Sequence, residues 1–208
     1  MPTYFWENHL LEVPLCGHLT QYAEDIKSEV LNYIQQPNIL FDYPLYSVED
    51  FQNNSIPLYE NLWKVVPVSI FDEEFISDLG DRENSIISNI ITNSKWNCPI
   101  LSTLISGLES QGDLNNCFIS KLSPGSVINP HKGLTSDCIR IHLGLVCDPD
   151  CKITIGNESR SWEEGKLLAF KYDDQNIFGV KHEGTFDRII LSLDLSISYL
   201  QKYVSNNL

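Results

Sequence analysis

The chain has 208 residues, of which 42% are hydrophobic, so it is long enough and apolar enough to fold around a sizeable core. It carries 14 lysines and arginines against 28 aspartates and glutamates, which gives a net charge of −14 at neutral pH. This charge argues against nucleic acid or an anionic membrane as the main partner, because both would repel an acidic surface.

The first half of the chain predicts helices separated by irregular structure. Residues 19–36 show helical spacing of apolar residues, and Pro37 ends that helix. Residues 37–62 are rich in Asn, Pro, Tyr and acidic residues, which favours irregular structure. Further helices are predicted at 81–93 and at 98–108, where Pro lies near the start and Gly near the end. The first of these two should bury four isoleucines: Ile86, Ile87, Ile90 and Ile91.

The second half, from Cys117 onward, predicts strands, because short apolar runs alternate with turn sequences such as Ser-Pro-Gly and Asp-Pro-Asp. The predicted strands are 117–122, 126–129, 138–147, 151–156, 166–171, 176–182 and 188–195. Many short strands after a helical segment indicate a mostly β protein with N-terminal helices, built as a double-stranded β-helix (a cupin-like jelly roll). We expect a single domain over 1–208, in which 1–115 is helical and irregular and 116–200 forms the jelly-roll core.

The chain ends and the cysteines bear on where the protein works. The first residues lack the basic and then apolar order of a signal peptide, and no stretch reaches the ~18 apolar residues of a membrane span. Six cysteines occur without the CxxC spacing of a metal finger. Cys147 and Cys151 flank a turn and could approach across a hairpin. Without an export signal, we expect reduced thiols and a cytoplasmic protein.

The segment from His131 to Leu145 has the clearest functional pattern. Its second half alternates like a strand, with Arg140 and His142 on one face and aliphatic residues on the other. A strand that directs Arg and His to the same side can line a pocket with hydrogen-bond donors. Guanidinium and imidazole both pair with carboxylate oxygens, so the pattern favours a site for a bound carboxylate.

This segment resembles the aspartyl/asparaginyl β-hydroxylase family of iron and 2-oxoglutarate dioxygenases. In that family a metal-binding His-x-Gly motif is followed by a strand reading Arg-x-His-Leu-Gly-Leu, as in His131-Lys-Gly and Arg140-Ile-His-Leu-Gly-Leu here. The resemblance covers roughly residues 95 to 195. It includes the Pro-Gly turn before His131, the Trp-Glu-Glu-Gly turn ending at Gly165, and the final strand that begins at Arg188.

The resemblance implies Fe(II) as cofactor, 2-oxoglutarate as cosubstrate, and a role for five residues. His131 corresponds to the first iron ligand and is the expected catalytic residue. Ser120, Arg140, His142 and Arg188 correspond to the residues that hold 2-oxoglutarate. Two alternatives stay open: Arg140 could instead pair with an internal aspartate, and Ser120 could be an ordinary strand residue.

The chain departs from the family pattern at the second metal histidine. Counting forward from the Tyr-Asp-Asp that ends at Asp174, or back from Arg188, places Phe178 at that position. Phenylalanine cannot ligate iron. His182 lies on the same strand face and is the alternative histidine ligand, but at ~3.3 Å per residue it would be ~13 Å away unless a bulge intervenes. Asp174 and Asn176 are alternative oxygen ligands.

Three functions are compatible with these residues. The first is an oxygenase that hydroxylates an amino-acid, peptide or other small substrate. The second is a metal-deficient pseudoenzyme that binds 2-oxoglutarate or a similar dicarboxylate. The third, a jelly-roll interaction module without a ligand, leaves the retained polar residues unexplained. The 37–62 region, with Tyr43, Tyr46 and Phe51, would either form a lid or substrate surface or pack against the helices.

Overall fold

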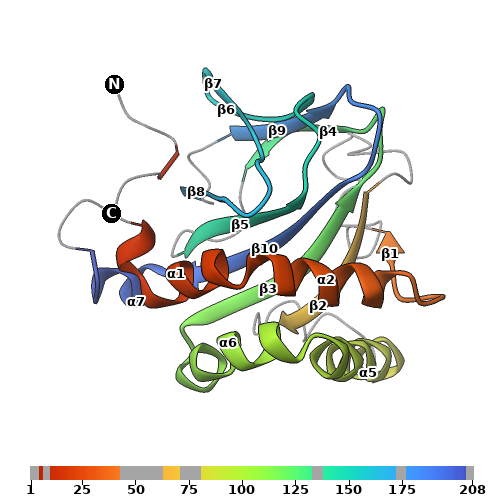
Figure 1. Ribbon diagram of the computed structural model, residues 1–208, viewed down its shortest axis with the longest axis vertical. Coiled ribbons are helices and arrows are strands. Elements are labelled where there is room, and N and C mark those ends of the chain that lie inside the picture. Colours follow the sequence, from red (N-terminus) through yellow and green to blue (C-terminus); the bar gives the residue numbers. More distant parts are fainter. Residues whose placement is uncertain are drawn as a thin grey trace.

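Two antiparallel sheets face each other, and helices cover the outer side of the larger one (Figure 1). The computed structural model describes residues 5–6, 10–42, 63–70, 81–132, 138–171 and 177–204. The predicted jelly roll with preceding helices is confirmed. None of the described helices combines the length and apolar character that crossing a membrane requires.

The larger sheet has six strands in the order β1-β2-β3-β10-β5-β8. Its central strand, β10, pairs with β3 on one side and β5 on the other, and the register sets Asp194 opposite Arg140 and Ser192 opposite His142. The register of this sheet therefore decides which polar residues meet. Its strands are β1 (Phe41–Asp42), β2 (Trp63–Ile70), β3 (Leu114–Leu122), β5 (Cys138–Val146), β8 (Leu167–Lys171) and β10 (Arg188–Ser196).

The smaller sheet has four strands in the order β4-β9-β6-β7. In the pairing of β4 with β9, His131 lies directly opposite Phe178. The residues that the sequence comparison aligned with the two metal histidines are therefore cross-strand neighbours. The strands are β4 (Val127–Lys132), β6 (Cys151–Ile155), β7 (Glu158–Ser161) and β9 (Ile177–His182).

Two hydrophobic clusters hold these layers together. One lies between the helices and the larger sheet, and the other lies between the two sheets. Strand β5 serves both, since Ile141 and Leu143 belong to the helix-side cluster and Cys138 to the inter-sheet cluster. The helical elements are η1 (Leu10–Glu12), α1 (Pro14–Gln21), α2 (Ala23–Ile34), α5 (Asp81–Asn97), α6 (Pro99–Gln111) and α7 (Ile197–Gln201).

The predicted helices need three corrections. The helix expected at 19–36 is two helices, α1 and α2, which meet at Tyr22. The next helix extends to Asn97, and Ile86, which was expected to be buried, is 44% exposed. Helix α6 passes through Gly107 and ends at Gly112, whose φ of 70° is the left-handed conformation that terminates helices.

Strand β2 was not predicted, although it lies between β1 and β3 in the larger sheet. Pro67 interrupts its apolar run, and proline argues against a central strand because it cannot donate to the ladder. The structure accommodates Pro67 at a register shift between Pro67 and Ser69. Strand β7 and helix α7 were also missed. Because β1 and β2 join the same sheet as the predicted core, the sheet extends beyond the segment 116–200.

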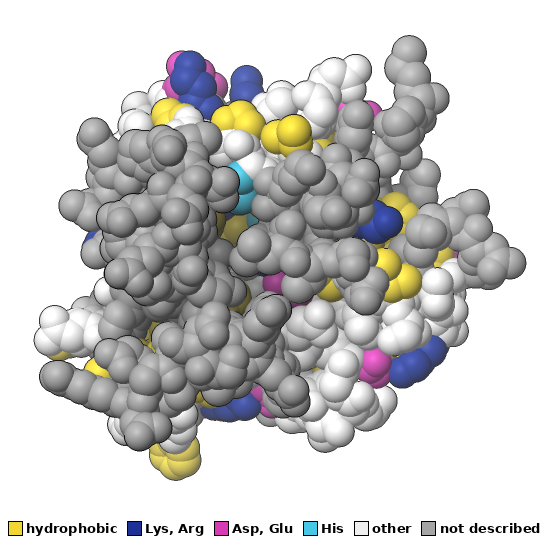
Figure 2. All heavy atoms as spheres, turned by 180° about the vertical axis from the view of Figure 1, so that it is seen from behind, with side chains coloured by type: hydrophobic (Ala, Val, Ile, Leu, Met, Phe, Trp, Pro, Cys, Tyr) yellow, Lys and Arg dark blue, Asp and Glu magenta, His cyan; other side chains and the backbone are white. Residues whose placement is uncertain are grey.

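Charges on the visible surface are dispersed. On the face shown in Figure 2, the coloured Lys, Arg, Asp and Glu side chains are scattered and do not gather into one basic patch.

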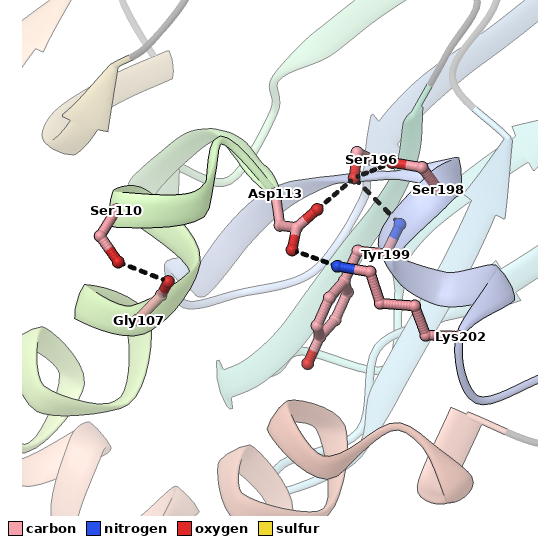
Figure 3. Close-up of polar contacts among 7 residues, drawn as sticks. All are labelled: Gly107, Ser110, Asp113, Ser196, Ser198, Tyr199 and Lys202. Carbon is pink, nitrogen blue, oxygen red and sulfur yellow. Dashed lines mark hydrogen bonds and ion pairs between the residues drawn. The ribbon is translucent and has the colours of Figure 1, made fainter.

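Just before β3, Asp113 connects to helix α7: its carboxylate accepts hydrogen bonds from Ser196 and from Lys202 (Figure 3). This contact fastens the C-terminal helix to the sheet.

Candidate carboxylate pocket

A pocket between the two sheets brings together the four residues that were expected to hold a cosubstrate. Ser120 comes from β3, Arg140 and His142 from β5, and Arg188 from β10, and all four line the pocket. They meet because β10 pairs with both β3 and β5. The prediction that Arg140 and His142 face inward from one strand and Arg188 from another is confirmed.

Arg188 is a buried charge without a carboxylate partner among the described residues. Its side chain is 2% exposed, and its Nη2 donates to Ser120 Oγ at 2.9 Å. The guanidinium lies over the Trp162 ring, with 4.8 Å from Cζ to the ring centroid. Among the described residues, none accepts a hydrogen bond from its Nε. Burial lowers the pKa of Arg188 to about 10, so it remains charged at neutral pH and favours an anion beside it.

Ser120 is more than an ordinary strand residue. Its Oγ accepts hydrogen bonds from Trp63 Nε1 at 3.0 Å and from Arg188 Nη2 at 2.9 Å. A hydroxyl oxygen has two lone pairs, and both are used by these contacts. The Ser120 hydroxyl is therefore left to donate its own proton toward a ligand acceptor.

His142 is held as a neutral donor by Trp162. The indole Nε1–H donates to His142 Nδ1 at 3.1 Å. Because an indole nitrogen can only donate, Nδ1 must be unprotonated and the ring proton must sit on Nε2. Burial lowers the pKa of His142 well below its usual value, and the charges of Arg140 and Arg188 add to this effect. In the sequence Trp162 is recognisable only as part of the Trp-Glu-Glu-Gly turn, and no sequence pattern indicates that it reaches His142.

Arg140 is paired with an internal aspartate. Its Nε and Nη2 donate to the two carboxylate oxygens of Asp194 at 2.7 and 2.8 Å, in the bidentate geometry that suits guanidinium. Asn116 also donates to this carboxylate, at 3.3 Å. Of the two possibilities left open for Arg140, the structure therefore shows the pairing with Asp194. A role for Arg140 in holding a cosubstrate stays a prediction.

His131 and Phe178 face each other at the rim of the same inter-sheet space. Their ring centroids are 4.2 Å apart, and Phe178 lines the pocket. His131 Nδ1 lies 2.8 Å from the carbonyl oxygen of Asn129, so Nδ1 carries the proton and Nε2 keeps its lone pair. Burial lowers the pKa of His131, which keeps the ring neutral at pH 7. That Phe178 stands where the family has its second metal histidine stays a prediction.

His182, the alternative metal ligand, makes hydrogen bonds to the backbone at the other end of β9. Its Nδ1 accepts from the Gly184 backbone N–H at 3.2 Å, and its Nε2 donates to the Phe186 carbonyl at 2.9 Å. The structure does not bring His182 to His131: the register shift in the β4–β9 pairing lies between Ile128 and His131 of β4, and His182 pairs with Cys151 of β6. Asp174 and Asn176 lie outside the described residues. Within the described part of the chain, no three His, Cys, Asp or Glu side chains gather as a metal site would require.

Comparison with known proteins places the chain in a family. The sequence profile of the aspartyl/asparaginyl β-hydroxylases matches residues 20–197, most of the chain. The chain belongs to the aspartyl/asparaginyl β-hydroxylase family. Over 104 residues it is 36% identical to human aspartate β-hydroxylase domain-containing protein 2, and over 77 residues it is 42% identical to mouse aspartyl/asparaginyl β-hydroxylase.

The matches to curated relatives are partial. The aligned segments cover 47% and 36% of this chain but only 28% and 10% of the human and mouse relatives. Among solved structures, a Trichoplax adhaerens prolyl hydroxylase, in complex with a hypoxia inducible factor oxygen degradation domain peptide fragment, aligns with a TM-score of 0.52. The alignment covers 94% of both chains at 14% identity. At this identity the likeness shows a shared fold.

Proposed function

We propose that this hydroxylase-family chain binds 2-oxoglutarate or a similar small carboxylate, with the carboxylate on Arg188. The observation that carries the proposal is the buried guanidinium, whose Nε has no partner in the described part of the chain. Leaving such a charge unmatched in an apolar interior is costly, and a bound carboxylate would remove that cost. Ser120 and His142 supply further donors in the same pocket. Every free polar hydrogen of these three side chains suits an acceptor ligand.

Calorimetry with 2-oxoglutarate tests this proposal. Arg188→Ala removes the guanidinium and should cost about 2–5 kcal/mol of binding free energy, because the ligand carboxylate would then be buried without a charged partner. Arg160→Ala is the matched control, since that side chain, in β7 of the smaller sheet, is 43% exposed and lies outside the pocket. Unchanged affinity in Arg188→Ala would contradict the assignment, as would a wild type that binds no carboxylate.

Iron fits the described residues less well than a carboxylate does. The family resemblance implies two histidine ligands, but Phe178 stands opposite His131 and a phenyl ring offers iron no lone pair. The described residues thus form at most one side of a metal site.

An oxygenase acting on an amino-acid, peptide or other small substrate is the second candidate. His131 is the observation that favours it. The Asn129 carbonyl holds the proton on Nδ1, which leaves Nε2 as a lone-pair donor, the arrangement usual for a metal-bound histidine. That activity would require both Fe(II) and 2-oxoglutarate. Anaerobic Fe(II) titration of the wild type and of His131→Ala separates the two candidates.

A further inference from the structure

The described residues that line the pocket carry one uncompensated positive charge. Of its two arginines, Arg140 is neutralised by Asp194 through two hydrogen bonds. Arg188 has no acidic partner among the described residues, and its closest polar contact is the hydroxyl of Ser120. His142 is neutral, because burial lowers its pKa well below its usual value. One ligand carboxylate is therefore matched by Arg188, whereas a second would find no free cation here.

The rest of the pocket wall is largely apolar. Phe178 occupies the position opposite His131, where the family resemblance implies a metal ligand, and it packs against Phe170 with ring centroids 5.7 Å apart. A carboxylate turned toward this wall would lose its hydration without gaining a hydrogen bond or a metal. A hydrocarbon group would instead gain buried apolar contact. The wall is formed by Ile128, Ile153, Phe170, Phe178, Val180 and Ile190, all of them buried.

We propose that this pocket selects a carboxylate with a single negative charge and an apolar body over a dicarboxylate of the same length. The inference rests on the proposed carboxylate site and narrows its ligand class. 2-Oxoglutarate, itself a dicarboxylate, would bind through one carboxylate, but more weakly than a monocarboxylate of the same length. The ligand carboxylate pairs with Arg188 and accepts from Ser120, while its hydrocarbon part lies against Phe170 and Phe178. Phe178 then offers the ligand apolar contact at the position where the family resemblance implies a metal ligand.

A pair of ligands of equal chain length tests the selectivity. Pentanoate and glutarate differ only in the second carboxylate, and calorimetry on the full chain with a metal chelator present measures both. Pentanoate should bind at least about tenfold more tightly, because the second carboxylate is desolvated without a partner. Glutarate binding equally or more tightly would overturn the inference but keep the carboxylate site. If pentanoate, glutarate and 2-oxoglutarate all fail to bind, both the inference and the proposed function are contradicted.

A variant of the internal aspartate tests the charge argument directly. Asp194→Asn has nearly the same shape but removes the negative charge that faces Arg140, so it adds one positive charge to the pocket. The affinity ratio should move toward glutarate by about tenfold or more, because the more positive pocket favours the second carboxylate. Asp150→Asn, an exposed position outside the pocket, makes the same charge change as a control. An unshifted ratio in folded Asp194→Asn contradicts the inference, and should that variant not fold, the wild-type comparison decides alone.

Discussion

Two tryptophans orient the polar groups of the pocket at the scale of single residues. Trp63 donates to Ser120 Oγ, and Trp162 donates to His142 Nδ1. Each indole can only donate, so it occupies a lone pair and leaves the hydroxyl or imidazole proton for the ligand. Trp162 also lies under the Arg188 guanidinium. Aromatic residues around the pocket thus determine which hydrogens a bound carboxylate meets.

Replacing Trp162 by phenylalanine tests this orientation. The variant keeps a ring beneath Arg188 but loses the N–H that holds His142 in one tautomer. Affinity for 2-oxoglutarate should fall about 5- to 10-fold, the value of roughly one hydrogen bond. The ¹⁵N spectrum of the His142 ring should show protonation on Nε2 in the wild type and mixed tautomers in the variant. Trp96→Phe, at an 85% exposed site, is the control, and an unaltered His142 spectrum in Trp162→Phe would refute the role.

The facing pair His131 and Phe178 gives a prediction about iron. Anaerobic titration should find weak Fe(II) binding in the wild type, because one imidazole gives iron too few protein ligands even with 2-oxoglutarate present. His131→Ala should abolish that binding, and Phe178→His should strengthen it because a second imidazole would then face the first across the strands. His182→Ala is the control, since both ring nitrogens are held by backbone groups. Tight iron binding that survives both His131→Ala and His182→Ala would place the metal elsewhere.

At the scale of elements, β10 pairs with both strands that carry the other polar pocket residues, and helix α7 follows directly at the C-terminal end of β10. Helix α7 begins at Ser196, whose side chain caps it by accepting from the Tyr199 backbone N–H. The same hydroxyl donates to Asp113, which also accepts from Lys202 at 2.8 Å (Figure 3). Asp113 is 5% exposed, so its carboxylate depends on these partners. The end of β10 is thereby tied to the start of β3.

Removing this buried acceptor should loosen the C-terminal helix. Asp113→Ala should lower the free energy of unfolding by about 1–3 kcal/mol, because the Ser196 hydroxyl loses its acceptor and α7 loses its anchor. Lys202→Ala should cost no more than about 1 kcal/mol, since that side chain is 51% exposed and its ion pair is screened by water. Urea unfolding measures both values. A larger loss for Lys202→Ala than for Asp113→Ala would contradict this account.

At the scale of the whole molecule, the two hydrophobic clusters enclose most of the cysteines. Five of the six are buried, and Cys147 is half-buried. Burial raises the pKa of the Cys16 and Cys98 thiols to about 12, and that of Cys117 well above its usual value. Thiols react as thiolates, so these groups are both inaccessible and protonated in the folded protein.

The folded protein should therefore resist thiol labelling. With an excess of a disulfide reagent at pH 8, we expect at most Cys147 to react on the timescale of minutes. After unfolding in guanidinium chloride, all six thiols should react rapidly, because their pKa values return to about 8.5. Counting released thiolate by absorbance makes the comparison, with Cys147→Ser as the control. Rapid labelling of several thiols in native protein would show that the clusters are less closed than described.

Local patterns in the sequence were sufficient to predict most strands of the second half and the face on which Arg140 and His142 lie. Side chains alternate in any strand, so parity alone assigns them to one side. The resemblance supplied the family, which the match over residues 20–197 confirms, whereas the pairing of Phe178 with His131 became visible only in the structure. Strand β2 was missed because proline is not expected inside a central strand, and its place became visible only through its pairing with β1 and β3.

The sequence by itself determined the jelly-roll pattern, the family and the candidate pocket residues, because these depend on short-range periodicity and on motifs. The tertiary structure alone decided which of those residues are free to bind. Arg140 and Asp194 are 54 residues apart, and Trp162 and His142 are 20 apart. Such pairs form only when strand register brings their side chains together, and register depends on packing across the whole sheet. Arg188 is consequently left as the unpaired charge among the described residues of the pocket, since the aspartate opposite Arg140 has already matched the other arginine.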